Sequence, residues 1–138
     1  MKKFILMLLL TFGTALFAQK QVEQEVKYIK ITQKKCLKKT GYQMVLKELI
    51  SDSRCPEGVN CIWAGEVTVL VSVYENKKFI EDKTITISIP KTDENIAILS
   101  NYLPTSQKKI KSVDIFPYPK KGVVLDAKSY YVRIGYVK

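Results

Sequence analysis

Apolar and polar residues alternate with a period of two along most of this chain, which is the pattern of strands that bury one face. In Val67–Tyr74 four valines share one face, and in Thr84–Ile89 three isoleucines share one face with hydroxyl side chains on the other. Between these segments Glu75–Lys78 supplies a polar turn, and its Asn76 tolerates the left-handed conformation of a tight hairpin. The two segments are therefore predicted to pair as an antiparallel hairpin.

The other regular segments have the same period. Tyr130–Val137 carries apolar bulk on both faces, which suits an inner strand. Three further strands are predicted, at Val26–Thr32, Tyr42–Ile50 and Lys109–Phe116. Asp93–Leu103 suits either a short strand or a single helical turn. About six or seven short strands of this spacing predict an all-β fold, an antiparallel β-sandwich of immunoglobulin-like architecture, with a small β-barrel as the second choice.

The N-terminus has the composition of a secretory signal peptide. Two lysines precede the apolar run Phe4–Leu10, and small residues ending at Ala18 complete the n-region, h-region and cleavage site. We expect cleavage after Ala18, which leaves residues 19–138 as a single β domain in the periplasm or outside the cell. A retained membrane anchor is the competing interpretation, but the run is shorter than the roughly 18 to 20 apolar residues that an anchor needs. After cleavage we expect no transmembrane segment.

Export places the chain in an oxidising compartment, where neighbouring cysteines are expected to be bridged. Cys55 and Cys61 enclose five residues that include Pro56 and Gly58, which can turn the chain back. A bridge there would stabilise the fold by about 2 to 2.5 kcal/mol and would mainly fix the shape of the loop. Cys36 is left over, as a buried thiol, an intermolecular partner or a competitor for one of the other two.

The chain contains no histidine. This argues against the common zinc and copper sites and against Ser-His-Asp and Cys-His catalytic arrangements. Paired carboxylates remain formally open, but the candidates show no spacing more telling than that of a polar loop: Glu48, Asp52, Glu57 and Glu66. No glycine-rich phosphate loop is present either. We therefore expect a protein that is not an enzyme and that binds no metal or cofactor.

The chain is basic, with a formal charge of +10 that falls to +8 when the two lysines of residues 1–18 are removed. Small lysine groups carry most of this charge, at Lys34–Lys35, Lys38–Lys39, Lys77–Lys78, Lys108–Lys109 and Lys120–Lys121. Lysines at loops and strand edges keep edges unpaired and the protein soluble. The alternative is a surface for an anionic polymer such as lipopolysaccharide, an acidic polysaccharide or nucleic acid. Sequence-specific nucleic-acid recognition relies on arginine, and only Arg54 and Arg133 are present.

Residues 52–66, DSRCPEGVNCIWAGE, gather two of the three cysteines, one of the two arginines and the only tryptophan. This segment resembles a pattern, Asp-Ser-Arg-Cys-Pro followed by Cys-x-Trp-x-Gly, found in a group of small exported bacterial proteins. The similarity runs from about Tyr42 to the C-terminus and includes the turn Phe116–Pro119. The resemblance implies a secreted or periplasmic β domain with a paired-cysteine loop, but no activity, substrate or catalytic residue. Cys36 lies outside the pattern, which favours a free thiol.

The segment joins two predicted strands and has two interpretations. As a structural corner, which we favour, Trp63 packs under the ring closed by the cysteines, and Arg54 lies over the indole or pairs with Asp52 or Glu66. As a recognition loop, Asp52, Arg54, Trp63 and Glu66 form a candidate binding site, because aromatic and arginine side chains dominate binding hot spots. We accordingly expect a binding or accessory domain for a protein or cell-envelope partner. The alternatives are an inhibitor of a secreted hydrolase and a basic polyanion-binding protein.

Overall fold

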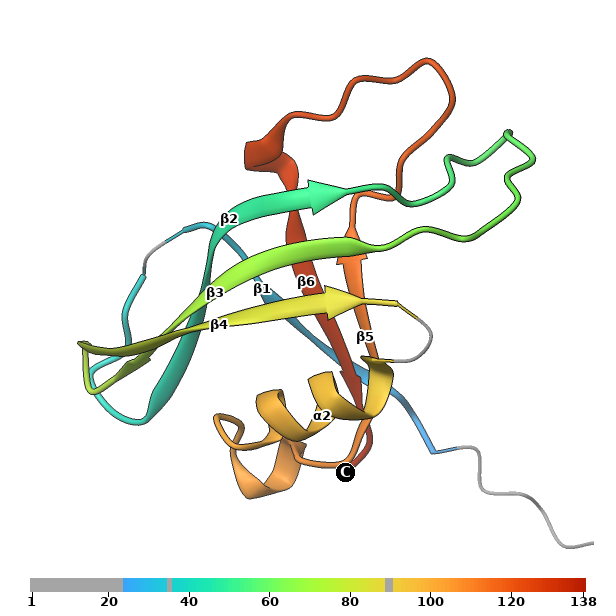
Figure 1. The fold of residues 1–138 in the computed structure, drawn as a ribbon. Helices are drawn as coiled ribbons and strands as arrows, with labels where there is room; N and C mark the ends of the chain where they lie inside the picture. The colour runs from blue at the N-terminus through green and yellow to red at the C-terminus, as the bar shows by residue number, and fades with distance from the viewer. Residues whose placement is uncertain (1–23, 35, 89–90) are drawn as a thin grey trace, which may run out of the picture.

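The structure of the protein is a computed structural model that describes residues 24–34, 36–88 and 91–138. The predicted signal peptide, residues 1–18, lies outside the described residues. Within them, six strands form two antiparallel three-stranded sheets with one short α-helix (Figure 1). The elements are β1 (Lys27–Ile31), β2 (Tyr42–Asp52), β3 (Val67–Glu75), β4 (Lys78–Ile87), α2 (Thr92–Ser100), β5 (Ile110–Phe116) and β6 (Tyr131–Tyr136). The strand orders are β1-β6-β5 and β2-β3-β4.

The predicted hairpin is confirmed as β3 and β4. The four valines of β3 are buried, and the turn residues Asn76 and Lys77 have φ values of 50° and 71°, in the left-handed region. The second strand begins at Lys78, well before the predicted start at Thr84, and pairs with β3 along its length. Its first half was missed because Lys78–Ile80 is exposed and lacks the alternation of a half-buried strand.

The last strand, β6, lies between β1 and β5, as its two apolar faces predict. Val132 and Ile134 are fully buried on one face. On the other face the rings of Phe116 and Tyr131 stack with their centroids 5.6 Å apart, and Arg133 lies over Phe116. The strands predicted at Val26–Thr32, Tyr42–Ile50 and Lys109–Phe116 are likewise confirmed, as β1, β2 and β5.

The structure corrects two expectations about the fold. The second choice, a small barrel, is wrong, because across the described residues the two sheets share no ladder that would close them. The fold is also mostly β rather than all-β, since Thr92–Ser100 is helical. The buried Asn95 of this helix donates a hydrogen bond of 2.7 Å from its amide to the Thr86 carbonyl of β4, and the buried Leu99 joins the core. Tertiary contacts therefore accompany the helical conformation of a segment whose sequence pattern suited either a strand or a helical turn.

One hydrophobic core draws buried side chains from both sheets and from α2. Its fully buried members include Leu46 of β2, Ile85 of β4 and Ile115 of β5. Two long connections extend beyond the sheets at the same end of the molecule (Figure 1). We call residues 53–66, between β2 and β3, the stapled loop, and residues 117–130, between β5 and β6, the opposing loop.

Candidate binding site at the stapled loop

The stapled loop leaves β2 and returns to β3 with its two arms held together by backbone hydrogen bonds. Ser53 donates its backbone N–H to the Glu66 carbonyl at 2.8 Å, and Cys55 donates to the Ala64 carbonyl at 2.9 Å. Gly65 has a φ of 73°, and a Cβ at this position would overlap the Ser53 carbonyl oxygen, so glycine is required there. The disulfide predicted between Cys55 and Cys61 is present, with the two Cα atoms 6.0 Å apart.

The base of this loop is a buried ion pair between the first and third residues of the motif. Arg54 donates from Nε to Asp52 Oδ1 at 2.8 Å and from Nη2 to Asp52 Oδ2 at 2.6 Å. Both side chains are less than a tenth exposed. Tyr130, just before β6, donates its hydroxyl to Asp52 Oδ2 at 2.9 Å. This bidentate, buried arrangement satisfies the carboxylate completely enough for it to remain charged inside the protein.

The same arginine ties the two sheets together. Arg54 Nη1 donates to the Ile115 carbonyl at the end of β5 at 2.6 Å, and Nη2 donates to the Pro117 carbonyl at 2.9 Å. The guanidinium lies over the ring of Tyr118, with Cζ 4.8 Å from the ring centroid. Four of its five N–H groups are thus used within the fold. Arg54 is therefore a structural cross-link with little capacity left for a ligand.

The pKa directions in this cluster follow from its hydrogen bonds. Burial by itself raises the pKa of Asp52, but hydrogen bonds from the side chain and backbone of Arg54 and from Tyr130 outweigh burial and hold the pKa below its usual range. Burial, and then the hydrogen bond to Asp52, raises the pKa of the Tyr130 hydroxyl. Asp52 is accordingly charged and Tyr130 neutral at neutral pH, as a hydrogen bond from hydroxyl to carboxylate requires.

The structure separates the four candidate residues into two groups. Asp52 and Arg54 form the buried base, and Arg54 pairs with Asp52 rather than with Glu66. Glu66 is half-buried at the end of the loop, where its backbone pairs with Ser53. Trp63 is 69% exposed, so its indole is not packed under the disulfide as a structural corner requires. The ring that Arg54 covers is Tyr118 instead.

The opposing loop was not part of the predicted site, yet it lies directly against the stapled loop. Glu57 donates its backbone N–H to the Pro119 carbonyl at 2.9 Å, and its own carbonyl accepts from Lys121 at 3.1 Å. The side chains of Lys120 and Glu57 form an ion pair at 3.4 Å. These partners are about 60 residues apart in sequence, so local pattern gave no signal that the two loops pair. The one pointer to this region was the Phe116–Pro119 turn, which is part of the resemblance to small exported proteins.

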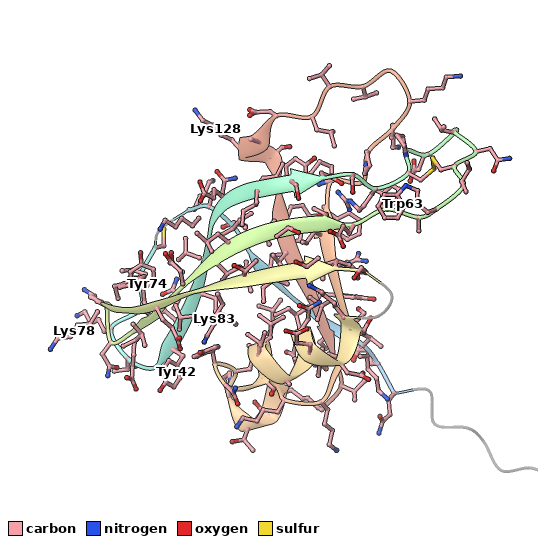
Figure 2. All side chains as sticks on the ribbon, in the orientation of Figure 1. Tyr42, Trp63, Tyr74, Lys78, Lys83 and Lys128 are labelled. Carbon is pink, nitrogen blue, oxygen red and sulfur yellow. A yellow bond between two sulfur atoms is a disulfide. The ribbon has the colours of Figure 1, made fainter. Side chains whose placement is uncertain are left out.

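The two loops together carry five exposed apolar side chains, which we call the two-loop tip: Val59, Ile62, Trp63, Val123 and Val124. Ile62 and Val124 are fully exposed, and Val123 is 55% exposed. Figure 2 shows Trp63 at the loop end of the molecule and Lys78 at the opposite end. The two loops adjoin through the backbone contacts of Glu57, and exposed apolar side chains concentrated on adjoining loops are a mark of an interaction site.

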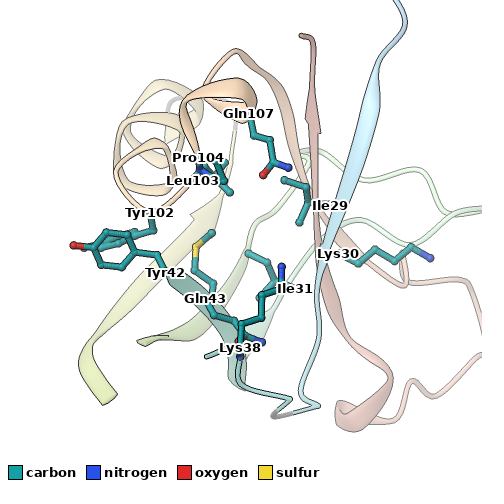
Figure 3. A pocket seen from close by; sticks show the side chains of 11 residues that line it. Ile29, Lys30, Ile31, Lys38, Tyr42, Gln43, Tyr102, Leu103, Pro104 and Gln107 are labelled. Carbon is teal, nitrogen blue, oxygen red and sulfur yellow. The ribbon is translucent and has the colours of Figure 1, made fainter. Parts of the chain in front are cut away.

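Other parts of the structure show less that points to a site. A cavity of about 240 Å³ lies between β1, β2 and the segment after α2, and it is lined by Lys38, Gln43 and Tyr102 among others (Figure 3). It contains none of the four candidate residues. Cys36 is free, as its place outside the pattern favours, and it is exposed, so of the alternatives the buried thiol and the competing bridge to Cys55 or Cys61 are wrong. Among the described residues no three Cys, Asp or Glu side chains gather closely enough to hold a metal ion.

Comparisons of this chain with protein-family models, with curated proteins and with solved structures found no match. The resemblance of residues 52–66 to small exported bacterial proteins therefore stays a prediction. In the described part of the chain, no helix has both the length and the apolar character to cross a bilayer.

Proposed function

We propose that this protein is an exported, non-enzymatic binding domain that contacts a cell-envelope partner through the two-loop tip. The observation that carries the proposal is the 69% exposure of Trp63 on a loop held by a disulfide and by a buried ion pair. A loop held in this way loses little conformational entropy on binding, and tryptophan is the residue most favoured in binding hot spots. The buried base thus serves to position the exposed tip.

The proposal is tested by retention on whole cell-envelope material, with the wild type compared with Trp63→Ala. We expect the wild-type protein to co-sediment with envelopes and Trp63→Ala to be retained at least about tenfold less, because removal of a central aromatic anchor costs more than about 2 kcal/mol. Ile80→Ala, an exposed apolar residue on β4, is the matched control and should behave as the wild type. Equal retention of all three proteins would contradict the proposal.

We also retain the finer expectation for the fold, a sandwich of immunoglobulin-like architecture. It is supported by a single core that draws on both three-stranded sheets. The sheet β2-β3-β4 is a simple meander. In the proposed sandwich it would form one of the two layers, as a variation on the immunoglobulin-like strand order.

A basic polyanion-binding role is the second candidate, and a different surface favours it. Lys34, Lys128 and Tyr131 line a cavity of about 470 Å³, and an adjoining cavity of about 390 Å³ shares Ser129 and Tyr131 with it. Lys30 Nζ lies 5.1 Å from the centroid of the Tyr131 ring. This role predicts that the protein binds an acidic polysaccharide and that the affinity falls steeply with added salt. The double variant Lys34→Glu with Lys128→Glu should abolish the binding. Salt-independent binding would exclude it.

A further inference from the structure

The two-loop tip differs from a protein-binding groove in its shape. Its residues lie on two adjacent loops that extend beyond the sheets (Figure 1), and the full exposure of Ile62 and Val124 means that neither side chain packs against a neighbour. A protein partner would need a separate complementary pocket for each of these side chains. A lipid bilayer accepts projecting apolar side chains without shape complementarity, since its interior is fluid and apolar.

The kinds of residue at the tip also fit a bilayer. Aliphatic side chains gain free energy by entering the acyl region, and tryptophan is enriched at the level of the headgroups, where its ring is apolar and its N–H remains hydrogen-bonded. The tip contains both kinds, with Ile62 and Val124 the most exposed and Trp63 next to Ile62.

The charges around the tip favour an anionic surface. Within residues 55–64 and 117–125 the only acidic residue is Glu57, and Lys120 pairs with it. Lys121 follows on the opposing loop with no ion-pair partner among the described residues. Basic residues beside an inserting apolar group are attracted to anionic lipid headgroups. No unpaired carboxylate of these two segments would have to approach the membrane.

We propose that the partner of the two-loop tip is the surface of a phospholipid bilayer, with anionic headgroups preferred. This inference rests on the function proposed above and names its partner. The stapled loop and the opposing loop insert their apolar side chains at one end of the domain, and Lys121 lies at the headgroups. Few side chains insert, so the association is reversible rather than a permanent anchor.

Trp63 is the only tryptophan of the chain, so its fluorescence reports directly on the tip. The processed protein is purified from the exported fraction, with its N-terminus verified, so that the apolar residues 4–10 do not contribute. It is titrated with vesicles of phosphatidylethanolamine and phosphatidylglycerol, and separately with phosphatidylcholine alone. We expect a blue shift of Trp63 emission, quenching by brominated acyl chains, and partitioning several-fold stronger for the anionic vesicles at low salt.

Matched variants separate insertion from general hydrophobicity. Ile62→Ser with Val124→Ser should lower the partition coefficient at least about tenfold, because two aliphatic side chains no longer leave water. Phe79→Ser with Ile80→Ser removes two exposed apolar residues of β4, next to Lys78 at the opposite end of the molecule (Figure 2). This control should partition as the wild type, and all proteins should keep their melting temperature within a few degrees.

The outcomes distinguish this inference from the proposed function. If Trp63 does not respond to either kind of vesicle but whole envelopes still retain the protein through Trp63, the lipid partner is wrong and a protein partner remains. If neither vesicles nor envelopes retain the protein, both proposals fail. Vesicle binding that survives Ile62→Ser with Val124→Ser and disappears in high salt would overturn insertion and favour the polyanion surface.

Discussion

The base and the tip of the stapled loop differ in almost every physical respect, although they belong to one short motif. At the base, Asp52 and Arg54 are less than a tenth exposed and have partners on both sheets. At the tip, Ile62 and Trp63 project into water. A cluster of rare residues in sequence is thus not one site: Asp52 and Arg54 are buried in the fold, whereas Ile62 and Trp63 are exposed. Variants at the base should therefore change stability, and variants at the tip should change only binding.

The largest effect is expected for Arg54→Ala. Removing the guanidinium leaves the buried Asp52 carboxylate without its main partner and breaks the link to the Ile115 carbonyl, which should lower the free energy of unfolding by about 3 to 5 kcal/mol. Urea denaturation at pH 7 measures this change. Arg133→Ala is the matched control, because its side chain is 34% exposed and its ion pair with Asp114 is 3.3 Å long. If the two variants lost equal stability, Arg54 would not act as a cross-link between the sheets.

The next effect is expected for loss of the disulfide. Cys55→Ser with Cys61→Ser should lower the free energy of unfolding by about 2 to 2.5 kcal/mol, since the bridge closes a small ring. The base is expected to persist without it, because no atom of either cysteine side chain takes part in the Asp52–Arg54 pair. Cys36→Ser serves as the control and should leave stability unchanged, since this cysteine is exposed and free. Complete unfolding of the double variant would show that the base depends on the bridge.

A smaller, pH-dependent effect is expected for Tyr130→Phe. At pH 7 the variant loses one hydrogen bond to a buried carboxylate, which should cost about 1.5 kcal/mol. The pKa of Asp52 is lowered in the folded protein, so its contribution is complete above the ordinary aspartate pKa of about 3.9 and is lost as the pH falls through the lowered value. Because Tyr130 helps to lower that pKa, the wild type should lose more stability in acid than the variant does.

Urea denaturation from pH 7 to pH 2 therefore tests whether the two stability curves converge in acid. A constant difference over this range would mean that Tyr130 acts through packing alone and not through the Asp52 carboxylate. Raising the pH gives an independent check. The raised pKa of Tyr130 means that the wild type loses the contribution of its neutral hydroxyl above about pH 10.

Local pattern predicted the elements whose apolar period marks a buried face. The alternation in β3, the polar turn at Asn76 and the two apolar faces of β6 all predicted what the structure shows. The disulfide was also predictable, because Cys55 and Cys61 are close in sequence and surround a turn. Strand β4 was predicted too short, since its exposed first half carries no period that a local search can detect.

The arrangement of the site could not be predicted, because its contacts are long-range. Arg54 meets the Ile115 carbonyl 61 positions away, and Tyr130 meets Asp52 78 positions away. The sequence identified Arg54 and Trp63 as unusual but did not distinguish the buried side chain from the exposed one. The expectation that the indole packs under the disulfide followed from the usual burial of tryptophan. The 69% exposure of Trp63 overturned it. The ring that lies against the Arg54 guanidinium belongs to Tyr118 of the opposing loop.

The smallest effect on stability is expected for Trp63, although it is the only tryptophan of the chain. Trp63→Ala should change the free energy of unfolding by no more than about 0.5 kcal/mol, because an exposed side chain with no buried partner contributes little to folding. Leu46→Ala, an apolar truncation in the core at 1% exposure, should cost about 2 to 5 kcal/mol in the same denaturation series. If Trp63→Ala instead approached the cost of Leu46→Ala, the indole would be part of the fold in solution. The two-loop tip would then lose its most exposed aromatic anchor, and the division between a structural base and a binding tip would not hold.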